Sequence, residues 1–185
     1  MIQHIKVWVK RLQKFANRWW YFPLLGVLAG IDLFILIVPT DAILISSVML
    51  KPKKWVRAFV WVSLGASIGA LALAAALQWD PGLVPRLFPG AFENDVWRWM
   101  DAFIDNHGGK ALFLIALSPF VQFPAVAITA LAGMPLTEIF LVCLAGRGIK
   151  AALFCYGASH APKLLMKIPF IKQELSIVEL PPAVK

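Results

Sequence analysis

The sequence is short of charged residues and of cysteine. Charged residues make up 15% of its 185 positions, whereas a soluble domain carries about 25%. The two cysteines, Cys143 and Cys155, lie in an apolar stretch without C-x-x-C spacing, which argues against a disulfide framework and a cysteine-ligated metal. Apolar residues reach 60%, and the mean hydropathy is +0.75. These values exclude intrinsic disorder and argue strongly against an ordinary soluble domain.

The sequence also lacks the signatures of common enzymes. It has no Ser/His/Asp grouping, no Walker phosphate loop and no H-E-x-x-H motif. The three histidines, His4, His107 and His160, are far apart along the chain. We therefore expect no enzyme activity, no metal site and no cofactor. Lys and Arg outnumber Asp and Glu by 18 to 10, but without a soluble basic module this excess indicates membrane headgroups rather than nucleic acid.

Two apolar segments are long enough to cross a bilayer, which takes about 20 residues. Residues 58–79 contain no charged side chain, and Gly65 and Gly69 form a G-x-x-x-G motif that allows close helix approach. Residues 139–161 form the second segment, which carries Arg147 and Lys150. The sequence therefore predicts an all-α integral membrane protein with two full spans.

Two further apolar segments are interrupted by proline. Pro39 divides residues 23–50, and Pro119 and Pro124 divide residues 111–134. Proline breaks the helical hydrogen-bond pattern, and the resulting limbs are too short to span a bilayer at about 1.5 Å per residue. We expect each segment to form a re-entrant helical hairpin, which enters the membrane and returns to the same side.

The remaining segments are more polar. Residues 1–22 predict a basic amphipathic helix in the headgroup layer, with a solvated helix packed on its own domain as the alternative. Residues 80–110 start irregularly and then predict a second interfacial helix that ends at residues 107–109. Residues 162–185 are expected to form a tail. The apolar stripe of the second interfacial helix is predicted to comprise Phe92, Val96, Trp97, Met100, Phe103 and Ile104.

The order of elements occurs twice, in residues 1–79 and 91–161: an interfacial helix, a broken hairpin and a span. Broken helices in two corresponding units are typical of inverted-repeat transporters. We therefore predict an inverted repeat of a re-entrant hairpin and a transmembrane helix.

Charge predicts the orientation. With re-entrant hairpins, most Lys and Arg residues lie on one side, in residues 1–22, 51–57 and 162–185. Most acidic residues lie on the other side, in residues 80–110 and at Glu138. The positive-inside rule then places both termini in the cytoplasm and residues 80–110 in the periplasm. If the first hairpin spanned the membrane instead, residues 51–57 would lie outside, against the rule.

Three short stretches carry a family resemblance. V-P-T-D at residues 38–41 is similar to a P-x-E/D signature. L-S-P-F-V-Q-F-P at residues 117–124 is followed by A-G-M-P at residues 132–135. G-R-G begins the stretch of residues 146–157. In this order they resemble the DedA superfamily, also called the VTT or SNARE-associated Golgi protein domain, and especially its YqaA-like branch. The resemblance covers about residues 22–161.

The resemblance implies two facing re-entrant hairpins and lipid transport. Relatives are proposed to return undecaprenyl phosphate or to scramble phospholipids, and proton coupling is proposed for several. Asp41 matches the acid after the hairpin proline, Asp32 the acid upstream and Arg147 the late Gly-Arg. The sequence departs from the family at the second hairpin, which lacks the two arginines of R-F-x-P-x-x-R, so phosphate binding by that hairpin is in doubt.

The candidate site residues are the charges at membrane depth and two nearby polar residues. The functional interpretation is that Asp32 and Asp41 take up protons while Arg147 binds a lipid phosphate with its planar guanidinium. The alternative is a set of structural ion pairs, with Lys150 reaching the inner interface. Two uncharged residues, Ser118 and Gln122, could hold a headgroup or satisfy backbone groups freed by the break.

Two functions from different classes remain. The first is a transporter, flippase or scramblase for a polyprenyl phosphate or a phospholipid, with membrane lipids as partners and protons as the coupling ion. The second is a non-transporting scaffold or envelope-homeostasis factor on the same fold. We expect a multi-pass protein of the inner (plasma) membrane, and a homo-oligomer is compatible with the sequence.

Overall fold

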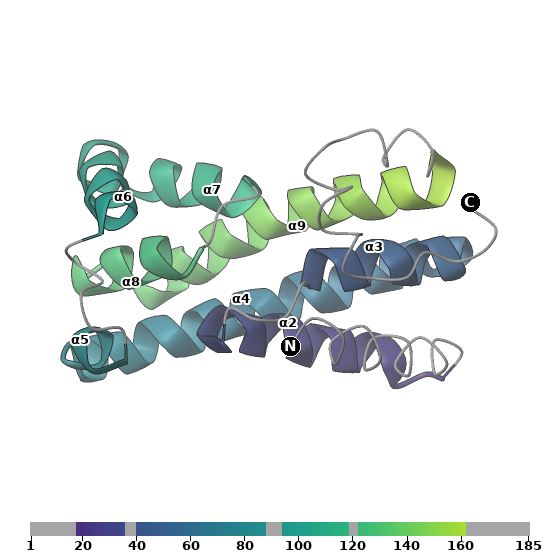
Figure 1. Cartoon of the computed structure of the whole chain (residues 1–185), viewed down its shortest axis with the longest axis horizontal. Coiled ribbons are helices and arrows are strands. Elements are labelled where there is room, and N and C mark those ends of the chain that lie inside the picture. Colours follow the sequence, from purple (N-terminus) through teal and green to yellow (C-terminus); the bar gives the residue numbers. More distant parts are fainter. Residues whose placement is uncertain (1–17, 36–39, 88–93, 119–121, 162–185) are drawn as a thin grey trace.

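The structure is a computed structural model that describes residues 18–35, 40–87, 94–118 and 122–161 (Figure 1). Its regular elements within these ranges are all helical, which confirms the predicted all-α class at that level. The segments 1–17 and 162–185, together with Pro39 and Pro119, lie outside the described residues. The elements are α2 (Tyr21–Ile35), α3 (Thr40–Leu50), η1 (Pro52–Lys54), α4 (Trp55–Trp79), α5 (Leu83–Leu87), α6 (Asp95–His107), α7 (Gly109–Leu117), α8 (Phe123–Leu131) and α9 (Leu136–His160).

Two long helices, α4 and α9, run the length of the protein and pack against each other (Figure 1). Each has 25 residues, or about 37 Å at 1.5 Å per residue. Both are long and apolar enough to cross a membrane, by length and composition. They begin three residues earlier than predicted: Pro52 opens the 3-10 turn that leads into α4, and Pro135, whose backbone is extended, is the N-cap residue directly before α9.

Both broken segments fold back on themselves. At one end of the protein, Tyr21 Oη at the start of α2 lies 2.7 Å from Ser47 Oγ near the end of α3. At the other end, Gln78 in the last turn of α4 donates a 2.8 Å hydrogen bond to the carbonyl of Met134, just after α8. The start of α7 lies at that same end, where Gly109 adjoins Glu138 of α9. The α2–α3 and α7–α8 hairpins therefore start from opposite ends and turn near the middle (Figure 1).

The hairpins pack on the long helices in a crossed pattern. The first limb of each hairpin lies on the long helix that follows it, α2 on α4 and α7 on α9. The second limb lies on the other long helix, α3 on α9 and α8 on α4. Each hairpin therefore bridges both long helices, and the middle of the protein is built from both halves of the chain.

Glycines allow the closest of these contacts. A Cβ atom on Gly30 of α2 would lie 2.8 Å from the carbonyl oxygen of Gly65, and one on Gly69 would lie 2.7 Å from the Cα of Gly30. The predicted role of Gly65 and Gly69 is thus confirmed, and the facing pair Gly26 and Gly30 completes a glycine seam between α2 and α4. In the other half, a Cβ on Gly146 of α9 would lie 2.7 Å from Ala116 Cβ of α7.

The second limbs form the two cores. Residues 42–48 of α3 are all buried, as are residues 123–130 of α8. A helix that is apolar all round is buried on every side, which fits the near-continuous apolar sequences of both limbs. Pro124 was predicted to lie in the break between the two limbs of this hairpin. It lies instead in the first turn of α8, where a backbone N–H would have no helical hydrogen-bond partner. α8 ends at Leu131, earlier than predicted, and Gly133 follows with φ 77°.

The predicted second interfacial helix is α6, a strongly amphipathic helix. Asn94 caps it by accepting a 2.9 Å hydrogen bond from the Val96 N–H, and Gly108 ends it with φ 53°. Trp97, Met100 and Ile104 are buried, as the predicted stripe requires. Val96 was also predicted to belong to this stripe but is exposed, so the buried face of α6 is narrower than predicted. Phe92 lies outside the described residues.

The outward surface of the long helices is apolar at mid-length. Every exposed residue between positions 60 and 77 of α4, and between 139 and 156 of α9, is uncharged and apolar. Large apolar side chains follow one another at helical spacing on these faces. They are Val60, Trp61, Leu64 and Ile68 on α4, and Leu141, Ile149, Leu153 and Tyr156 on α9.

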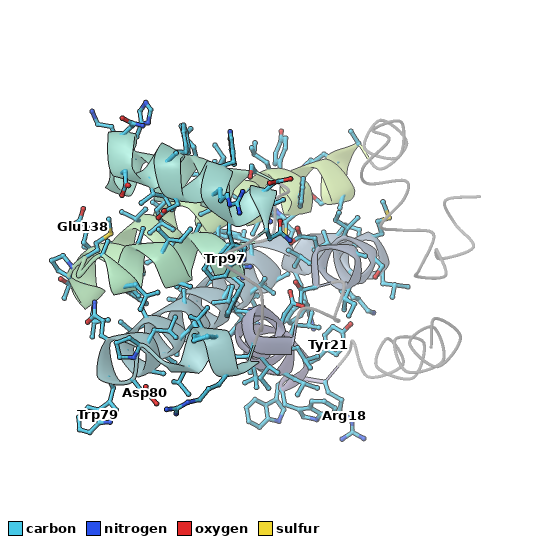
Figure 2. The ribbon with its side chains drawn as sticks, turned by 60° about the vertical axis from the view of Figure 1, so that its left-hand side comes forward. Arg18, Tyr21, Trp79, Asp80, Trp97 and Glu138 are labelled. Carbon is cyan, nitrogen blue, oxygen red and sulfur yellow. The ribbon has the colours of Figure 1, made fainter. Side chains whose placement is uncertain are left out.

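The charged residues gather at the two ends, and they differ in sign. The end where α2 and α4 begin, here called the basic end, carries Arg18, Lys51, Lys53, Lys54 and Arg57. The opposite end, here called the acidic end, carries Asp80, Asp95, Asp101, Asp105 and Glu138, besides Arg86, Arg98 and Lys110. Trp79 and Asp80 extend outward at the acidic end, while Trp97 lies on the inner side of α6 (Figure 2).

Candidate functional site

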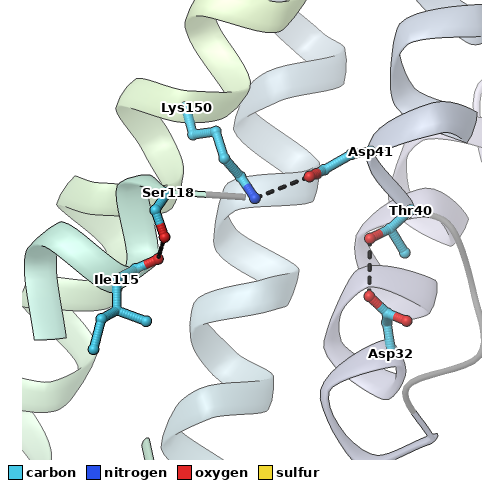
Figure 3. A network of polar contacts seen from close by, with 6 residues as sticks. All are labelled: Asp32, Thr40, Asp41, Ile115, Ser118 and Lys150. Atoms are coloured by element: carbon cyan, nitrogen blue, oxygen red, sulfur yellow. Dashed lines mark hydrogen bonds and ion pairs between the residues drawn. The ribbon is translucent and has the colours of Figure 1, made fainter. Parts of the chain in front are cut away.

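The charges predicted at membrane depth lie near the tips of the two hairpins, against the middle of α9. We call this region the polar layer, and it comprises Asp32, Thr40, Asp41, Ser118, Gln122, Arg147 and Lys150. These residues come from α2, α3, the ends of α7 and α8, and α9, so both hairpins contribute to it (Figure 3).

An ion pair joins the first hairpin to α9. Lys150 Nζ lies 2.9 Å from Asp41 Oδ2, and the two side chains are only 13% and 26% exposed. Asp41 lies in the first turn of α3, where the helix dipole favours a negative charge. Burial strengthens the attraction between the two charges relative to water. Lys150 therefore points inward at Asp41 rather than reaching toward the interface, and it forms a structural contact between the two halves.

Asp32 lies in the turn of the first hairpin on the α2 side. Thr40 Oγ1 donates a 3.0 Å hydrogen bond to Asp32 Oδ2 (Figure 3). This bond ties the last part of α2 to the first residue of α3 across the break. Thr40 was not among the predicted site residues. Its position next to Asp41, directly after the hairpin proline, is the signal by which the sequence could have indicated it.

Ser118 and Gln122 flank the break of the second hairpin. Ser118 follows the last residue of α7, and its hydroxyl donates a 2.8 Å hydrogen bond to the Ile115 carbonyl. This contact agrees with the alternative that Ser118 satisfies backbone groups freed by the break. Gln122 caps α8, is buried, and donates a 3.1 Å hydrogen bond from Nε2 to Cys143 Sγ of α9. The predicted burial of Cys143 and Cys155 is confirmed.

Arg147 lies on α9 three residues before Lys150. Its Nε is buried and has no hydrogen-bond partner among the described residues, and the same holds for Ser63 Oγ of α4. A Cβ built on Gly148, the residue after Arg147, would lie 4.0 Å from Ser63 Oγ, so Ser63 faces α9 at this level. Buried polar atoms without a partner are rare in native proteins, because each costs about 1–3 kcal/mol.

The pairing within the polar layer differs from one expectation. Arg147 was expected to find either Asp32 or Asp41, or a lipid phosphate. The structure instead pairs Asp41 with Lys150 and bonds Asp32 to Thr40, and it records no ion pair for Arg147 within the described ranges. The reason is helical spacing, since Lys150 lies almost one turn beyond Arg147 on α9 and faces the start of α3.

Across the part of the chain that the structure describes, no three His, Cys, Asp or Glu residues come together as a metal site.

Comparison of the chain with protein-family models, with curated proteins and with solved structures gives no match.

Proposed function

We propose that the chain is a multi-pass inner-membrane protein that moves a phosphate-bearing lipid across the bilayer, and that it belongs to the DedA/VTT superfamily that its motifs resemble. Large apolar side chains cover the outward faces of α4 and α9 at mid-length, and this supports the proposal that the protein is embedded in a membrane. Soluble proteins rarely expose such continuous apolar surface, whereas lipid acyl chains solvate it. The two candidate spans have mean hydropathy values of 2.0 and 1.7.

The charge of the two ends supports the orientation. The basic end carries five cations and no described acid, while the acidic end has the larger number of carboxylates. By the positive-inside rule the basic end faces the cytoplasm. The fold-back of both hairpins then makes them re-entrant, one from each side. The crossed packing of the two hairpins on α4 and α9 supports the inverted repeat, because corresponding limbs make corresponding contacts.

The observation that carries transport is the buried Arg147 Nε, which has no hydrogen-bond partner among the residues that the structure describes. A guanidinium stays charged at all physiological pH values and grips phosphate oxygens with two parallel hydrogen bonds. An arginine at mid-membrane requires such a partner. The lipid phosphate fills that role in this proposal, while Asp41 and Lys150 exchange their mutual contact for contacts with the passing headgroup. Protonation of Asp32 or Asp41 would couple the cycle to protons.

The competing function, a membrane scaffold, is favoured by the Asp41–Lys150 ion pair. A closed pair with a separation of 2.9 Å needs no ligand, and in a scaffold it holds the two halves together. The two functions differ in what they require of Arg147. A scaffold needs only a stable fold, whereas a transporter needs the planar guanidinium group of Arg147 to bind the phosphate.

The test is a lipid translocation assay in proteoliposomes with fluorescent phospholipid and polyprenyl phosphate as separate substrates. Arg147→Lys keeps the charge and loses the fork. We expect it to fold like the native chain and to translocate about tenfold more slowly or worse, since a charge-assisted contact contributes about 1.5–3 kcal/mol. Arg86→Gln is the matched control, because Arg86 is exposed at the acidic end. Native activity in Arg147→Lys, or none in the native chain, would favour the scaffold.

A further inference from the structure

A second candidate site lies away from the polar layer, between α6 and the C-terminal end of α8. It is a cleft of about 340 Å³, within the usual size range of small-ligand sites. The end of α8 lies about 14 Å from Gln122 at its start, given nine residues at 1.5 Å each. The cleft therefore belongs to the acidic end of the protein. Its lining residues are Trp97, Arg98, Asp101, Ile128, Leu131 and Ala132.

The cleft combines an apolar wall with a rim of both charges. Ile128, Leu131 and the buried Trp97 supply the wall. Arg98 and Asp101 are three residues apart on α6, a spacing that puts them on the same helix face. Arg98 is held only weakly by its own helix, since its nearest acid is Asp95 at 3.9 Å and the two side chains are 66% and 100% exposed. Among the residues that the structure describes, no ion pair is recorded for Asp101, so both rim charges are available to a ligand.

The placement of the charges indicates the ligand. The carbonyl end of α8 carries the negative pole of the helix dipole, so it adds to Asp101 in attracting a cation. An ammonium group with its N–H donors suits a carboxylate. Arg98, on the same rim, suits phosphate. The complementary ligand carries an ammonium and a phosphate close together and an apolar tail.

We infer that this cleft binds the headgroup of a zwitterionic amino-phospholipid, with the phosphate at Arg98, the ammonium at Asp101 and the first part of an acyl chain along Ile128 and Leu131. The inference rests on the proposed function, since it requires the acidic end to lie in a bilayer leaflet. It adds a substrate preference, because a lipid held here lies at the C-terminal end of α8, one length of that helix from Gln122 in the polar layer.

The experiment measures lipid binding to the full-length chain in detergent by native mass spectrometry. Phosphatidylethanolamine and phosphatidylglycerol with identical acyl chains are titrated separately, and soluble glycerophosphoethanolamine is added as a competitor. The native chain should bind phosphatidylethanolamine about three- to tenfold more tightly, as expected for one additional charge-assisted contact at a partly exposed site. The soluble competitor should be far weaker, because it lacks the tail.

Two variants separate the rim charges. Asp101→Asn should lower phosphatidylethanolamine affinity to that of phosphatidylglycerol and so remove the preference. Arg98→Gln should weaken both lipids about equally, because both carry phosphate. Asp105→Asn and Arg86→Gln are matched controls, exposed at the same end but outside the cleft, and they should leave the preference intact.

Equal binding of the two lipids to the native chain, or the same loss in Asp105→Asn as in Asp101→Asn, would overturn the inference. Competition by the soluble headgroup at the same concentration as the lipid would show a headgroup site without a tail contact, and would also overturn it. The readout is independent of translocation. A chain that prefers phosphatidylethanolamine but moves no lipid would refute the proposed transport and leave the cleft standing.

Discussion

Lys150 and Asp41 are 109 residues apart in the sequence, yet their Nζ and Oδ2 atoms are 2.9 Å apart in the structure. Asp41 begins the second limb of the first hairpin, and Lys150 lies on the long helix of the other half. The pair thus joins the two halves of the protein within the polar layer. Its energetic contribution can be measured directly.

Removing one member of this pair should be costly, and removing both should cost less than the sum. Asp41→Asn leaves the Lys150 charge without its partner, and Lys150→Met leaves Asp41 likewise. We expect each single variant to lower the free energy of unfolding by about 2–4 kcal/mol, with a coupling energy of about 1–3 kcal/mol in the double variant. Reversible unfolding in mixed micelles provides the measurement.

The matched control is the exposed pair of Arg86 and Asp80, whose N–O distance is also 2.9 Å but whose side chains are 70% and 38% exposed. Its coupling energy should stay below about 1 kcal/mol. Similar coupling energies for the two pairs would show that burial adds nothing to the Asp41–Lys150 contact.

Arg147 should behave as energetically independent of Asp41. Because Lys150 is the partner of Asp41, adding Asp41→Asn to Arg147→Gln should not restore stability. We expect the two changes in unfolding free energy to add within about 0.5 kcal/mol. Rescue of Arg147→Gln by Asp41→Asn would mean that the two charges neutralise each other, and would remove the basis for a phosphate at Arg147.

The glycine seam between α2 and α4 should not tolerate a methyl group. Gly30→Ala places a Cβ 2.8 Å from the Gly65 carbonyl oxygen, so the helices must separate, at a cost of about 1–3 kcal/mol. Gly148→Ala in α9 is the control, since its Cβ would approach nothing closer than Ser63 Oγ at 4.0 Å. There the higher helix propensity of Ala should make the change neutral or stabilising. Thermal unfolding of both variants compares them, and equal melting temperatures would contradict the close packing of α2 on α4.

The proposed orientation can be tested by labelling single cysteines with a membrane-impermeant maleimide. Lys54→Cys at the basic end should react only from the cytoplasmic side, and Asn94→Cys at the start of α6 only from the opposite side. The native Cys143 and Cys155 are buried, and replacing both with Ala provides the background. Labelling of positions 54 and 94 from the same side would refute the re-entrant arrangement.

Much of the fold could be predicted from periodicity and proline. The long helices, the limbs of both hairpins and α6 appear at nearly the predicted residues, because each has a composition that permits only one local structure. The starts of α4 at Trp55 and of α9 at Leu136 were predicted three residues too late. The charged residues just before each apolar run were interpreted as lying outside the helix, whereas the helical backbone includes them. The second glycine pair, Gly26 and Gly30, was also missed, since a seam involves two helices and one sequence motif shows only one side.

The candidate site was predictable in its members but not in their pairing. Asp32, Asp41, Arg147 and Lys150 could be selected because charges within apolar segments are costly. Which base meets which acid depends on how α9 is rotated against α3, and rotation is fixed by packing across the two halves rather than by local sequence. Cys143 was not recognised as the hydrogen-bond partner of Gln122 for a similar reason, since their contact joins the second hairpin to α9. Thr40 bonds to Asp32 within one hairpin, and its position next to Asp41 could have indicated it.

The crossed packing of the hairpins has a consequence for biosynthesis. α3 is buried along residues 42–48, yet part of its cover comes from α9, the last of the described helices to leave the ribosome. The hydroxyls of Ser46 and Ser47 donate hydrogen bonds to the Ile43 carbonyl of their own helix. These two donors are therefore already paired before α9 packs on α3. Closing so long a loop carries an entropic cost, and the first hairpin therefore completes its packing only after the final helix has been made. A nascent chain interrupted before α9 would leave part of α3 uncovered.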